Sequence, residues 1–166
     1  MNTVFEWLKA IIILPLNVLV IIPLILLYCT NYGRQLIGLP QVTTGIILLL
    51  IGLLLAAWTM SLFARKGKGT PAPWNPPPNL VIIGPYAHVR NPMLTSVFIM
   101  QIGECLCLGS WALWIWLAVF LSINLVYLPL CEEKDLEQRF GQSYTEYRHN
   151  VPRWIPRLTP WKPSAR

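Results

Sequence analysis

Two long runs without a charged residue constrain this chain more than any other feature. They cover residues 10–28 and 42–64, and each approaches or exceeds the roughly 20 apolar residues that cross a bilayer as a helix. Of the 166 residues, 55% are hydrophobic and only 12% are charged, whereas ordinary soluble domains carry about 25% charged residues. The sequence therefore predicts an all-α integral membrane protein.

A second pair of apolar runs covers residues 93–108 and 111–130, with only Gly109 and Ser110 between them. So short a connection predicts an antiparallel helical hairpin. The first run of the chain is too long for the apolar part of a signal peptide, and no small-residue cleavage site follows it. We therefore expect about four transmembrane helices, the last two forming a C-terminal hairpin.

The basic residues predict the orientation in the membrane. Of the 13 lysines and arginines, only Arg34 lies between the first two expected spans, and with four spans all the others fall on the opposite side. Cytosolic loops carry this excess of positive charge. Both termini are therefore expected in the cytosol, and we expect a multi-pass protein of a bacterial or archaeal inner membrane.

The remaining composition argues against several classes of function. The net charge of +6 is explained by orientation and by attraction to anionic headgroups, so we expect no nucleic-acid partner. The four cysteines lie in or beside the spans without a CxxC pair, which favours buried apolar packing over a metal site. No GxGxxG or GxxxxGK[ST] motif is present, so a Rossmann or P-loop site is not expected.

The stretch "GPYAHVRNPM" at residues 84–93 stands at the start of the hairpin. Asn91 and Pro92 predict a helix start, since asparagine is a common cap and proline fits the first turn. The proline-rich residues 65–91 before it predict a stiff cytosolic loop. Arg90 lies beside the expected helix N-terminus, and together they form a candidate anion site.

Hairpin geometry brings this stretch close to a second polar one, "CEEKD" at residues 131–135. If the two helices are antiparallel about residues 109 and 110, Ala87 lies level with Glu132. Two interpretations remain open: a ligand site at the membrane boundary, or a structural salt bridge between Arg90 and Glu132 or Glu133.

The last third of the chain is expected to cover the cytosolic face. Leu136, Phe140, Tyr144 and Tyr147 share the spacing of one face of a helix, which predicts a cytosolic amphipathic helix. The tail "VPRWIPRLTPWKP" mixes tryptophan, arginine and proline as interfacial segments do.

At this point the residues carry a resemblance. "GPYAHVRNPM" followed by "EEKDLEQRFGQSYTEYRHNVPRWIP" resembles the isoprenylcysteine carboxyl methyltransferase family and its phospholipid methyltransferase relatives, over about half of the chain. The resemblance implies a membrane-embedded methyltransferase that binds S-adenosyl-L-methionine at the cytosolic ends of its helices. It also implies a lipid or other lipophilic substrate that arrives from the bilayer.

Taken by position, the resemblance implies a set of cofactor-binding residues. Tyr86 matches the tyrosine of the family's GxY turn, Glu132 matches the first glutamate of the pair, and Arg90 matches an arginine beside the cofactor's carboxylate. The helix start and, by a looser alignment, an upstream stretch are expected to line the same site: Asn91, Pro92, Met93 and Leu94, and Pro78, Asn79, Leu80 and Val81.

Two departures bear on the substrate. The family often has tyrosine where this chain has Leu94, and eukaryotic members carry a substrate-side arginine where this chain has Leu128. The sequence therefore does not decide between three methyl acceptors: an isoprenylcysteine-type carboxylate, a phospholipid amine and another small lipophile. A carboxylate needs no base, whereas an amine or phenol would make Glu133 or His88 a candidate general base.

Three further expectations complete the sequence-based hypothesis. Residues 1–166 form one domain, made of two spans (1–64), the loop (65–91), the hairpin (92–130) and a cofactor-enclosing C-terminal segment (131–166). Glu104, inside an expected span, is interpreted as a structural partner of Gln101, one turn away. The alternatives to a methyltransferase are an NADPH-dependent membrane reductase of the sterol-reductase type and a non-catalytic membrane scaffold.

Overall fold

The computed structural model describes residues 12–30, 36–67 and 78–163. It contains no strand in these ranges, so the predicted all-helical fold is confirmed for the described chain. The longer helices are α2 (Ile22–Cys29), α3 (Leu39–Leu62), α4 (Pro92–Leu108), α5 (Trp111–Tyr127), α6 (Glu133–Phe140) and α7 (Gln142–Asn150). Three π-helical segments (Ile12–Ile21, Phe63–Gly67, Leu128–Glu132) and a 3₁₀ turn (Gly84–Ala87) complete the description.

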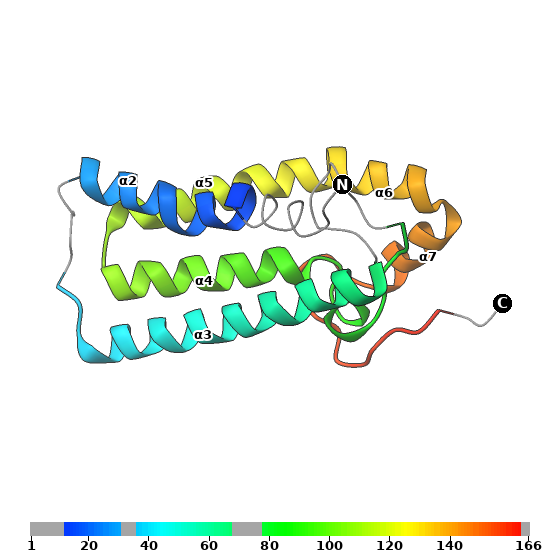
Figure 1. The fold of residues 1–166 in the computed structure, drawn as a ribbon, viewed down its shortest axis with the longest axis horizontal. Helices are drawn as coiled ribbons and strands as arrows, with labels where there is room; N and C mark the ends of the chain where they lie inside the picture. The colour runs from blue at the N-terminus through cyan, green and yellow to red at the C-terminus, as the bar shows by residue number, and fades with distance from the viewer. Residues whose placement is uncertain (1–11, 31–35, 68–77, 164–166) are drawn as a thin grey trace.

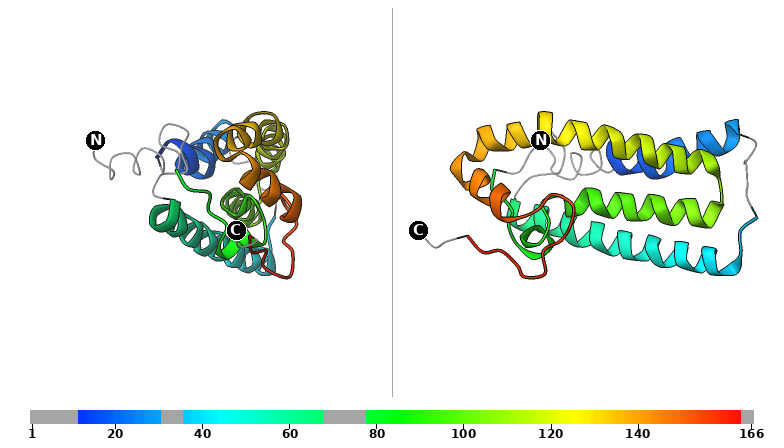
Figure 2. Two further views of the ribbon diagram at one scale, coloured as in Figure 1. Left: turned by 90° about the vertical axis from the view of Figure 1, so that its right-hand side faces the viewer. Right: turned by 180° about the vertical axis from the view of Figure 1, so that it is seen from behind.

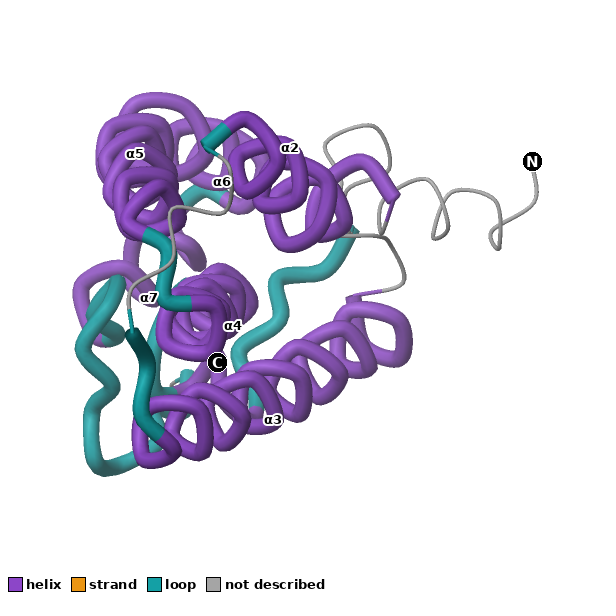
Figure 3. Tube along the Cα trace, turned by 90° about the vertical axis from the view of Figure 1, so that its left-hand side faces the viewer, coloured by secondary structure: helices purple, strands orange, loops and turns teal. Residues whose placement is uncertain are grey.

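The helices α2, α3, α4 and α5 lie side by side along the long axis of the molecule, with α4 between α3 and the α2–α5 pair (Figures 1 and 3). One end carries the turn between α4 and α5, the end of α2 and the start of α3 (Figure 1). The opposite end carries α6, α7, the turn before α4 and the C-terminal segment, as the view from behind also shows (Figure 2). The polar parts of the chain are thus gathered at one end of the bundle.

The predicted hairpin is confirmed. Helices α4 and α5 each have 17 residues, and the two residues between them make the turn. Gly109 has φ = 59°, a left-handed conformation that glycine adopts at little cost. Because the two arms are equally long, the start of α4 and the end of α5 lie at the same end of the bundle.

The tightest helix pair is α3 against α4, where glycines replace side chains. A Cβ atom on Gly103 would lie 2.8 Å from the carbonyl oxygen of Gly45, and one on Gly52 would lie 2.9 Å from that of Ser96. Gly45, Gly52 and the fully buried Thr59 are seven residues apart, the repeat that keeps one stripe facing a partner in left-handed packing. Small residues of this kind let helices associate within a bilayer.

The N-terminal segment is linked to α5 by a carbonyl that a proline leaves unpaired. In a π-helix the carbonyl of residue i accepts from the N–H of residue i+5, and five residues after Val18 stands Pro23, which has no N–H. The indole Nε1 of Trp116 donates to the Val18 carbonyl instead, at 3.1 Å. This bond joins the π-helical segment to α5 at the carbonyl that lacks a helical partner.

The outer faces of the bundle are apolar. Exposed large hydrophobic side chains follow one another along α3 and α5, among them Ile47, Leu54, Trp58, Ile115 and Ile123. Two continuous helices, Leu39–Gly67 and Trp111–Phe140, are long and apolar enough to cross a membrane, and Pro15–Cys29 and Pro92–Leu108 are shorter apolar helices. The membrane character is thus supported, and the four-span topology stays a prediction.

One expectation about the cytosolic end is corrected. Residues 131–150 do not form one amphipathic helix, because Gly141, at φ = 54° and ψ = −131°, separates α6 from α7. An L-residue rarely adopts this conformation, so glycine permits the bend. Leu136 and Phe140 nevertheless pack against the buried Tyr144 and Tyr147, because the bend folds α7 back onto the same side.

We predict that Gly103→Ala lowers the thermal stability of the detergent-solubilised protein. Alanine normally favours a helix by about 1 kcal/mol over glycine, but here its methyl group would meet the backbone of α3, and overpacking costs about 1–3 kcal/mol. Ala57→Leu, on an exposed position of α3, is the control and is expected to leave the unfolding temperature nearly unchanged. Equal or higher stability of Gly103→Ala would refute the close seam.

The topology can be tested with two natural cysteines. Cys29 and Cys131 are both exposed, and they lie at opposite ends of the bundle, at the end of α2 and just before α6. If the basic end faces the cytosol, a membrane-impermeant thiol reagent should label Cys131 only in inside-out vesicles and Cys29 only in right-side-out vesicles. Labelling of both from one side would contradict the prediction.

Candidate functional site

The 3₁₀ turn Gly84–Ala87 is packed against the end of α3. Gly84 has φ = 59°, and a Cβ there would lie 3.3 Å from the Trp58 ring, so both its backbone conformation and its surroundings favour glycine. The following Pro85, Tyr86 and Ala87 are buried. The Tyr86 ring lies against Phe63, with centroids 5.4 Å apart. The first four residues of the "GPYAHVRNPM" stretch are therefore packed against α3 and do not form a free loop.

The C-terminal segment lies along this turn and is held by backbone hydrogen bonds. The amides of Arg157 and Trp161 donate to the carbonyls of His88 and Ala87 at 3.0 and 2.9 Å, and the amide of Arg90 donates to the Pro152 carbonyl at 2.9 Å. The tail thus lies across the end of the bundle that carries the turn Gly84–Ala87, and its predicted role in enclosing a cofactor stays a prediction.

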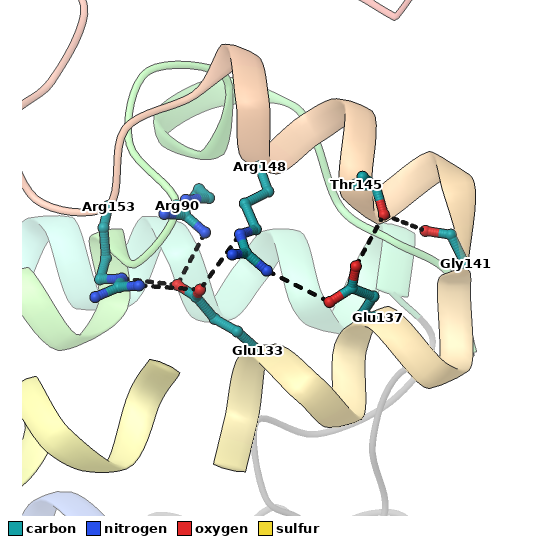
Figure 4. Close-up of polar contacts among 7 residues, drawn as sticks. All are labelled: Arg90, Glu133, Glu137, Gly141, Thr145, Arg148 and Arg153. Atoms are coloured by element: carbon teal, nitrogen blue, oxygen red, sulfur yellow. Dashed lines mark hydrogen bonds and ion pairs between the residues drawn. The ribbon is translucent and has the colours of Figure 1, made fainter. Parts of the chain in front are cut away.

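A buried carboxylate, Glu133, is the centre of the polar contacts at this end (Figure 4). Its side chain is 5% exposed, and its Oε1 accepts from Arg90 at 2.8 Å and from Arg153 at 2.7 Å. Arg153 also donates to Oε2 at 3.0 Å, and the Arg148 guanidinium lies 3.8 Å from the same oxygen. One carboxylate thereby joins α6, α7, the residues before α4 and the tail.

The two adjacent glutamates lie in different environments, because consecutive helical residues point about 100° apart and the π-helical turn Leu128–Glu132 sets the direction of the helix that carries them. This turn continues α5 into α6 and contains Pro129. One extra residue in a helical turn rotates the rest of the helix by about 100°. Glu133 is consequently buried, whereas Glu132 is exposed and has no hydrogen-bond or ionic partner within the described residues. The sequence left Arg90 open to pairing with either glutamate, and in the structure it pairs with Glu133.

Tyr86 lies near Glu132 with its hydroxyl unused. The Tyr86 backbone carbonyl accepts a hydrogen bond from the hydroxyl of Tyr147 at 2.7 Å. The hydroxyl of Tyr86 itself is buried and finds no partner in the described part of the chain. Burial, the nearby Tyr147 and the nearby Glu132 raise the pKa of Tyr86 well above its ordinary value, so Tyr86 is a neutral hydrogen-bond donor at physiological pH.

Two more buried donors at this end lack an acceptor among the residues described, Arg90 Nε and the indole Nε1 of Trp154. Trp154 follows Arg153, the partner of Glu133, and its ring lies 5.6 Å from that of Phe98 on α4. Sequence analysis interpreted Trp154 only as an interfacial residue. The one signal for more was its place directly after an arginine in the family-like "VPRWIP" stretch.

The predicted start of α4 is confirmed, but its cap is different. The helix begins at Pro92 after Asn91, whose side chain makes no capping hydrogen bond. The Asn91 carbonyl accepts from the Thr95 amide and hydroxyl at 3.0 and 2.9 Å. The first-turn amides of Met93 and Leu94 therefore receive no acceptor from the cap residue.

The upstream stretch that was expected to line the site is divided between two surroundings. Pro78 and Asn79 are exposed, and the Asn79 side chain donates to the Lys66 carbonyl at 3.4 Å. Val81 is buried, and Leu80 packs with the cluster of Tyr144, Tyr147 and Val151. Their role in ligand binding stays a prediction.

Of the two candidate bases, Glu133 is occupied by structural contacts, whereas His88 is held through one of its two ring nitrogens. Both oxygens of Glu133 accept from arginine. The Nδ1 of His88 lies 2.8 Å from the Arg157 carbonyl. Since a carbonyl only accepts, Nδ1 carries the proton and Nε2 keeps the lone pair that a base needs. Within α4, both amide atoms of Gln101 are buried without a partner in the described chain, so the expected hydrogen bond between Gln101 and Glu104 is not formed.

Comparison with known proteins identifies the family. The pattern described as "Phospholipid methyltransferase" matches residues 40–143, well over half of the chain. The chain belongs to the phospholipid methyltransferase family. The match includes α3, α4, α5 and α6, and with them the glycine seam, Tyr86, Arg90 and both glutamates.

A curated relative of this phospholipid methyltransferase family member is Protein-S-isoprenylcysteine O-methyltransferase from Schizosaccharomyces pombe. The two are 35% identical over 77 residues, which is 46% of this chain and 33% of the relative. The chain thus spans about a third of the relative's length. No solved structure matches the chain.

We predict that Glu133→Gln loosens the whole C-terminal segment. Removing the charge leaves Arg90 and Arg153 partly buried without their counter-ion, and breaking a buried ion pair costs about 3–5 kcal/mol. Trypsin should then cleave after Arg153 and Arg157 much faster than in the unaltered protein. Asp135→Asn removes only an exposed pair with Arg139 and should change neither stability nor cleavage. Unchanged cleavage of Glu133→Gln would show that the backbone bonds alone hold the tail.

Proposed function

We propose that this protein is a membrane-embedded, S-adenosyl-L-methionine-dependent methyltransferase that acts on a lipid-soluble acceptor. The observation that carries the proposal is that one end of an apolar bundle holds both an unpaired carboxylate, Glu132, and buried donors that have no acceptor within the described residues. Family membership favours methyl transfer over the reductase and scaffold alternatives. The methyltransferase named among its relatives supports the same reaction class.

The donor set fits the charged end of the cofactor. S-adenosyl-L-methionine carries an α-carboxylate, which needs hydrogen-bond donors, and an α-ammonium, which needs an acceptor. Three buried donors have no partner in the described chain: Arg90 Nε, Tyr86 Oη and Trp154 Nε1. The backbone amides at the start of α4 add partial positive charge at the N-terminus of that helix. Glu132 offers the complementary negative charge. Unused buried polar groups cost free energy, so a ligand that satisfies them is stabilised.

When bound, the cofactor would supply a methyl group on a sulfonium centre: an electron pair of the acceptor would form a bond to the methyl carbon while the C–S bond breaks and leaves a neutral thioether. The protein's task in such a reaction is positioning and exclusion of water. The tail from Pro152 to Trp161 covers the end of the bundle through its bonds to Ala87, His88 and Arg90. Glu133 is paired with arginines and thereby holds the tail and the residues before α4 together. We therefore assign Glu133 a positioning role and not the role of a base.

The surroundings of Leu128 bear on the acceptor. Leu128 is 2% exposed at the start of the π-helical turn. The resemblance implies an arginine at this position in the eukaryotic members of the family. Arg90 and Arg153, at the same end of the bundle, already pair with Glu133. We therefore propose an acceptor whose head group is not a carboxylate, such as a phospholipid amine or another small lipophile. The protein is further proposed to span the membrane four times, with both termini and this site on the cytosolic side.

We predict that Glu132→Gln weakens S-adenosyl-L-methionine binding at least tenfold, because a hydrogen bond to a charged group is worth about 1.5–3 kcal/mol. Tyr86→Phe should weaken binding about three- to tenfold through the loss of one neutral donor. Isothermal titration calorimetry of the detergent-solubilised protein measures both. Glu146→Gln, a nearby acid on α7 outside the site, is the control and should bind as the unaltered protein does.

The acceptor is found by incubating the protein with isotopically labelled cofactor and total membrane lipid, followed by mass spectrometry of the labelled products. A labelled lipid that is absent with Glu132→Gln supports the proposal. If the unaltered protein binds no S-adenosyl-L-methionine, or binds it with equal affinity in both site variants, the proposed site is wrong.

A further inference from the structure

The C-terminal tail holds two large apolar side chains away from the rest of the protein. Leu158 is 97% exposed and Ile155 is 79% exposed. The tail is not a free end at this point, because the backbone bonds of Arg157 and Trp161 to residues 87–88 hold it on both sides of Leu158. Exposed apolar side chains on a segment held in this way indicate that another surface covers them.

The end of α3 shows at which level the tail lies. Along this helix and the π-helical segment after it, the exposed residues change from the aromatic Trp58 to the basic Arg65 and Lys66, over a distance of about 10 Å. A change from apolar and aromatic to basic side chains marks the border between hydrocarbon and headgroups. The turn Gly84–Ala87 packs against Trp58, and the tail is bonded to the last residue of this turn. The tail therefore lies at the level where the headgroups of a membrane are expected.

Charge is divided between the two sides of the polar end. The tail lies on the side of α3, and α6 lies on the other side (Figures 1 and 2). In the described chain, every acidic residue of this end lies within residues 132–146, and α3, the turn before α4 and the tail contain none. The side of α3 instead exposes three basic residues, Arg65, Lys66 and Lys162. This side of the protein is therefore both apolar and positively charged.

We call these exposed apolar and basic residues the interfacial patch: Trp58, Ile155 and Leu158, and Arg65, Lys66 and Lys162. The combination suits the surface of a membrane with anionic lipids, because apolar side chains enter the acyl boundary while cations meet the headgroups. The patch also continues the apolar outer face of α3, a helix long and apolar enough to cross a membrane. We propose that the interfacial patch docks on anionic headgroups of that same membrane and thereby holds the tail across the end of the bundle.

Docking of this kind depends on lipid charge and on salt. One basic residue near an anionic membrane surface strengthens association about fivefold, and the screening length falls from about 10 Å at 0.1 M salt to about 3 Å at 1 M. The tail is bonded to His88 and Arg90, next to the candidate site, so anionic lipid should also favour cofactor binding. That consequence rests on the proposed function, whereas the docking itself does not.

The docking is tested with a bimane fluorophore on Leu158→Cys, in a protein whose exposed cysteines are removed by Cys29→Ser and Cys131→Ser. In nanodiscs, lipids with a doxyl quencher near the headgroup should quench the fluorophore strongly when phosphatidylglycerol is present. Quenching should be weak in phosphatidylcholine alone and at high salt. Gln138→Cys, at an exposed position of α6 on the other side, is the control and should stay unquenched throughout. This readout needs neither cofactor nor turnover.

Two pairs of variants, each compared in the same lipid, separate the apolar from the ionic contribution. In nanodiscs with phosphatidylglycerol, Leu158→Asn should speed hydrogen exchange of the tail amides severalfold, whereas Thr159→Asn, at the next exposed residue, should not change it. Lys162→Gln should weaken docking about fivefold, measured as a higher phosphatidylglycerol content at half-maximal quenching. Lys134→Gln removes an exposed charge from α6 and should leave the docking unchanged.

A fluorophore on residue 158 that stays unquenched, or that is quenched equally with and without phosphatidylglycerol, would overturn the docking. Equal exchange in Leu158→Asn and Thr159→Asn would show that the membrane does not hold the tail, and would overturn the proposal in that part.

The link to the candidate site is judged separately by calorimetry. S-adenosyl-L-methionine should bind more tightly with phosphatidylglycerol than without it, and Leu158→Asn should lose this difference. Equal affinity in both lipids would overturn the link. If the cofactor binds in neither lipid, the proposed function is wrong while the docking result stands.

Discussion

The polar end of this protein depends on the ionic contacts of Glu133. A carboxylate that is only 5% exposed would be costly without partners, and Arg90, Arg148 and Arg153 supply them from three different segments. The walls of the candidate site are therefore placed by one residue that is not itself free to bind a ligand. Loss of this contact would release the tail, α7 and the residues before α4 together.

A local irregularity gives the two neighbouring glutamates different roles. In an uninterrupted α-helix, α6 would be rotated by about 100° relative to its present position, and Glu133 would not meet its arginines. The π-helical turn around Pro129 makes the adjustment, and such bulges often occur at functional sites. It buries the structural glutamate and leaves Glu132 unpaired, within the described residues, beside Tyr86. The chemistry proposed for this end, recognition of a zwitterionic cofactor end by one carboxylate and several donors, depends on that separation.

Much of this arrangement could be predicted from the sequence. The uncharged runs required helices, and the two-residue link at Gly109 and Ser110 required a hairpin of equal arms. These two facts alone bring "GPYAHVRNP" and "CEEKD" together, and the contact between Arg90 and Glu133 confirms it. The bend at Gly141 was missed because the apolar spacing of residues 136–147 suits one helix, and spacing does not record a glycine conformation. The glycine seam was missed because it consists of absent side chains, which hydrophobic patterns do not count.

The amino-acid sequence alone dictates the membrane character, the helical hairpin and the end of the bundle where polar residues meet, because hydropathy and linker length are local properties. Two other features depend on the folded chain: which glutamate is buried, and which donors stay unpaired among the described residues. They depend on how α6, α7 and the tail pack around one carboxylate and on a single extra residue in a helical turn. Contacts between segments far apart in the chain are set by packing and electrostatics in three dimensions, and no local pattern encodes them.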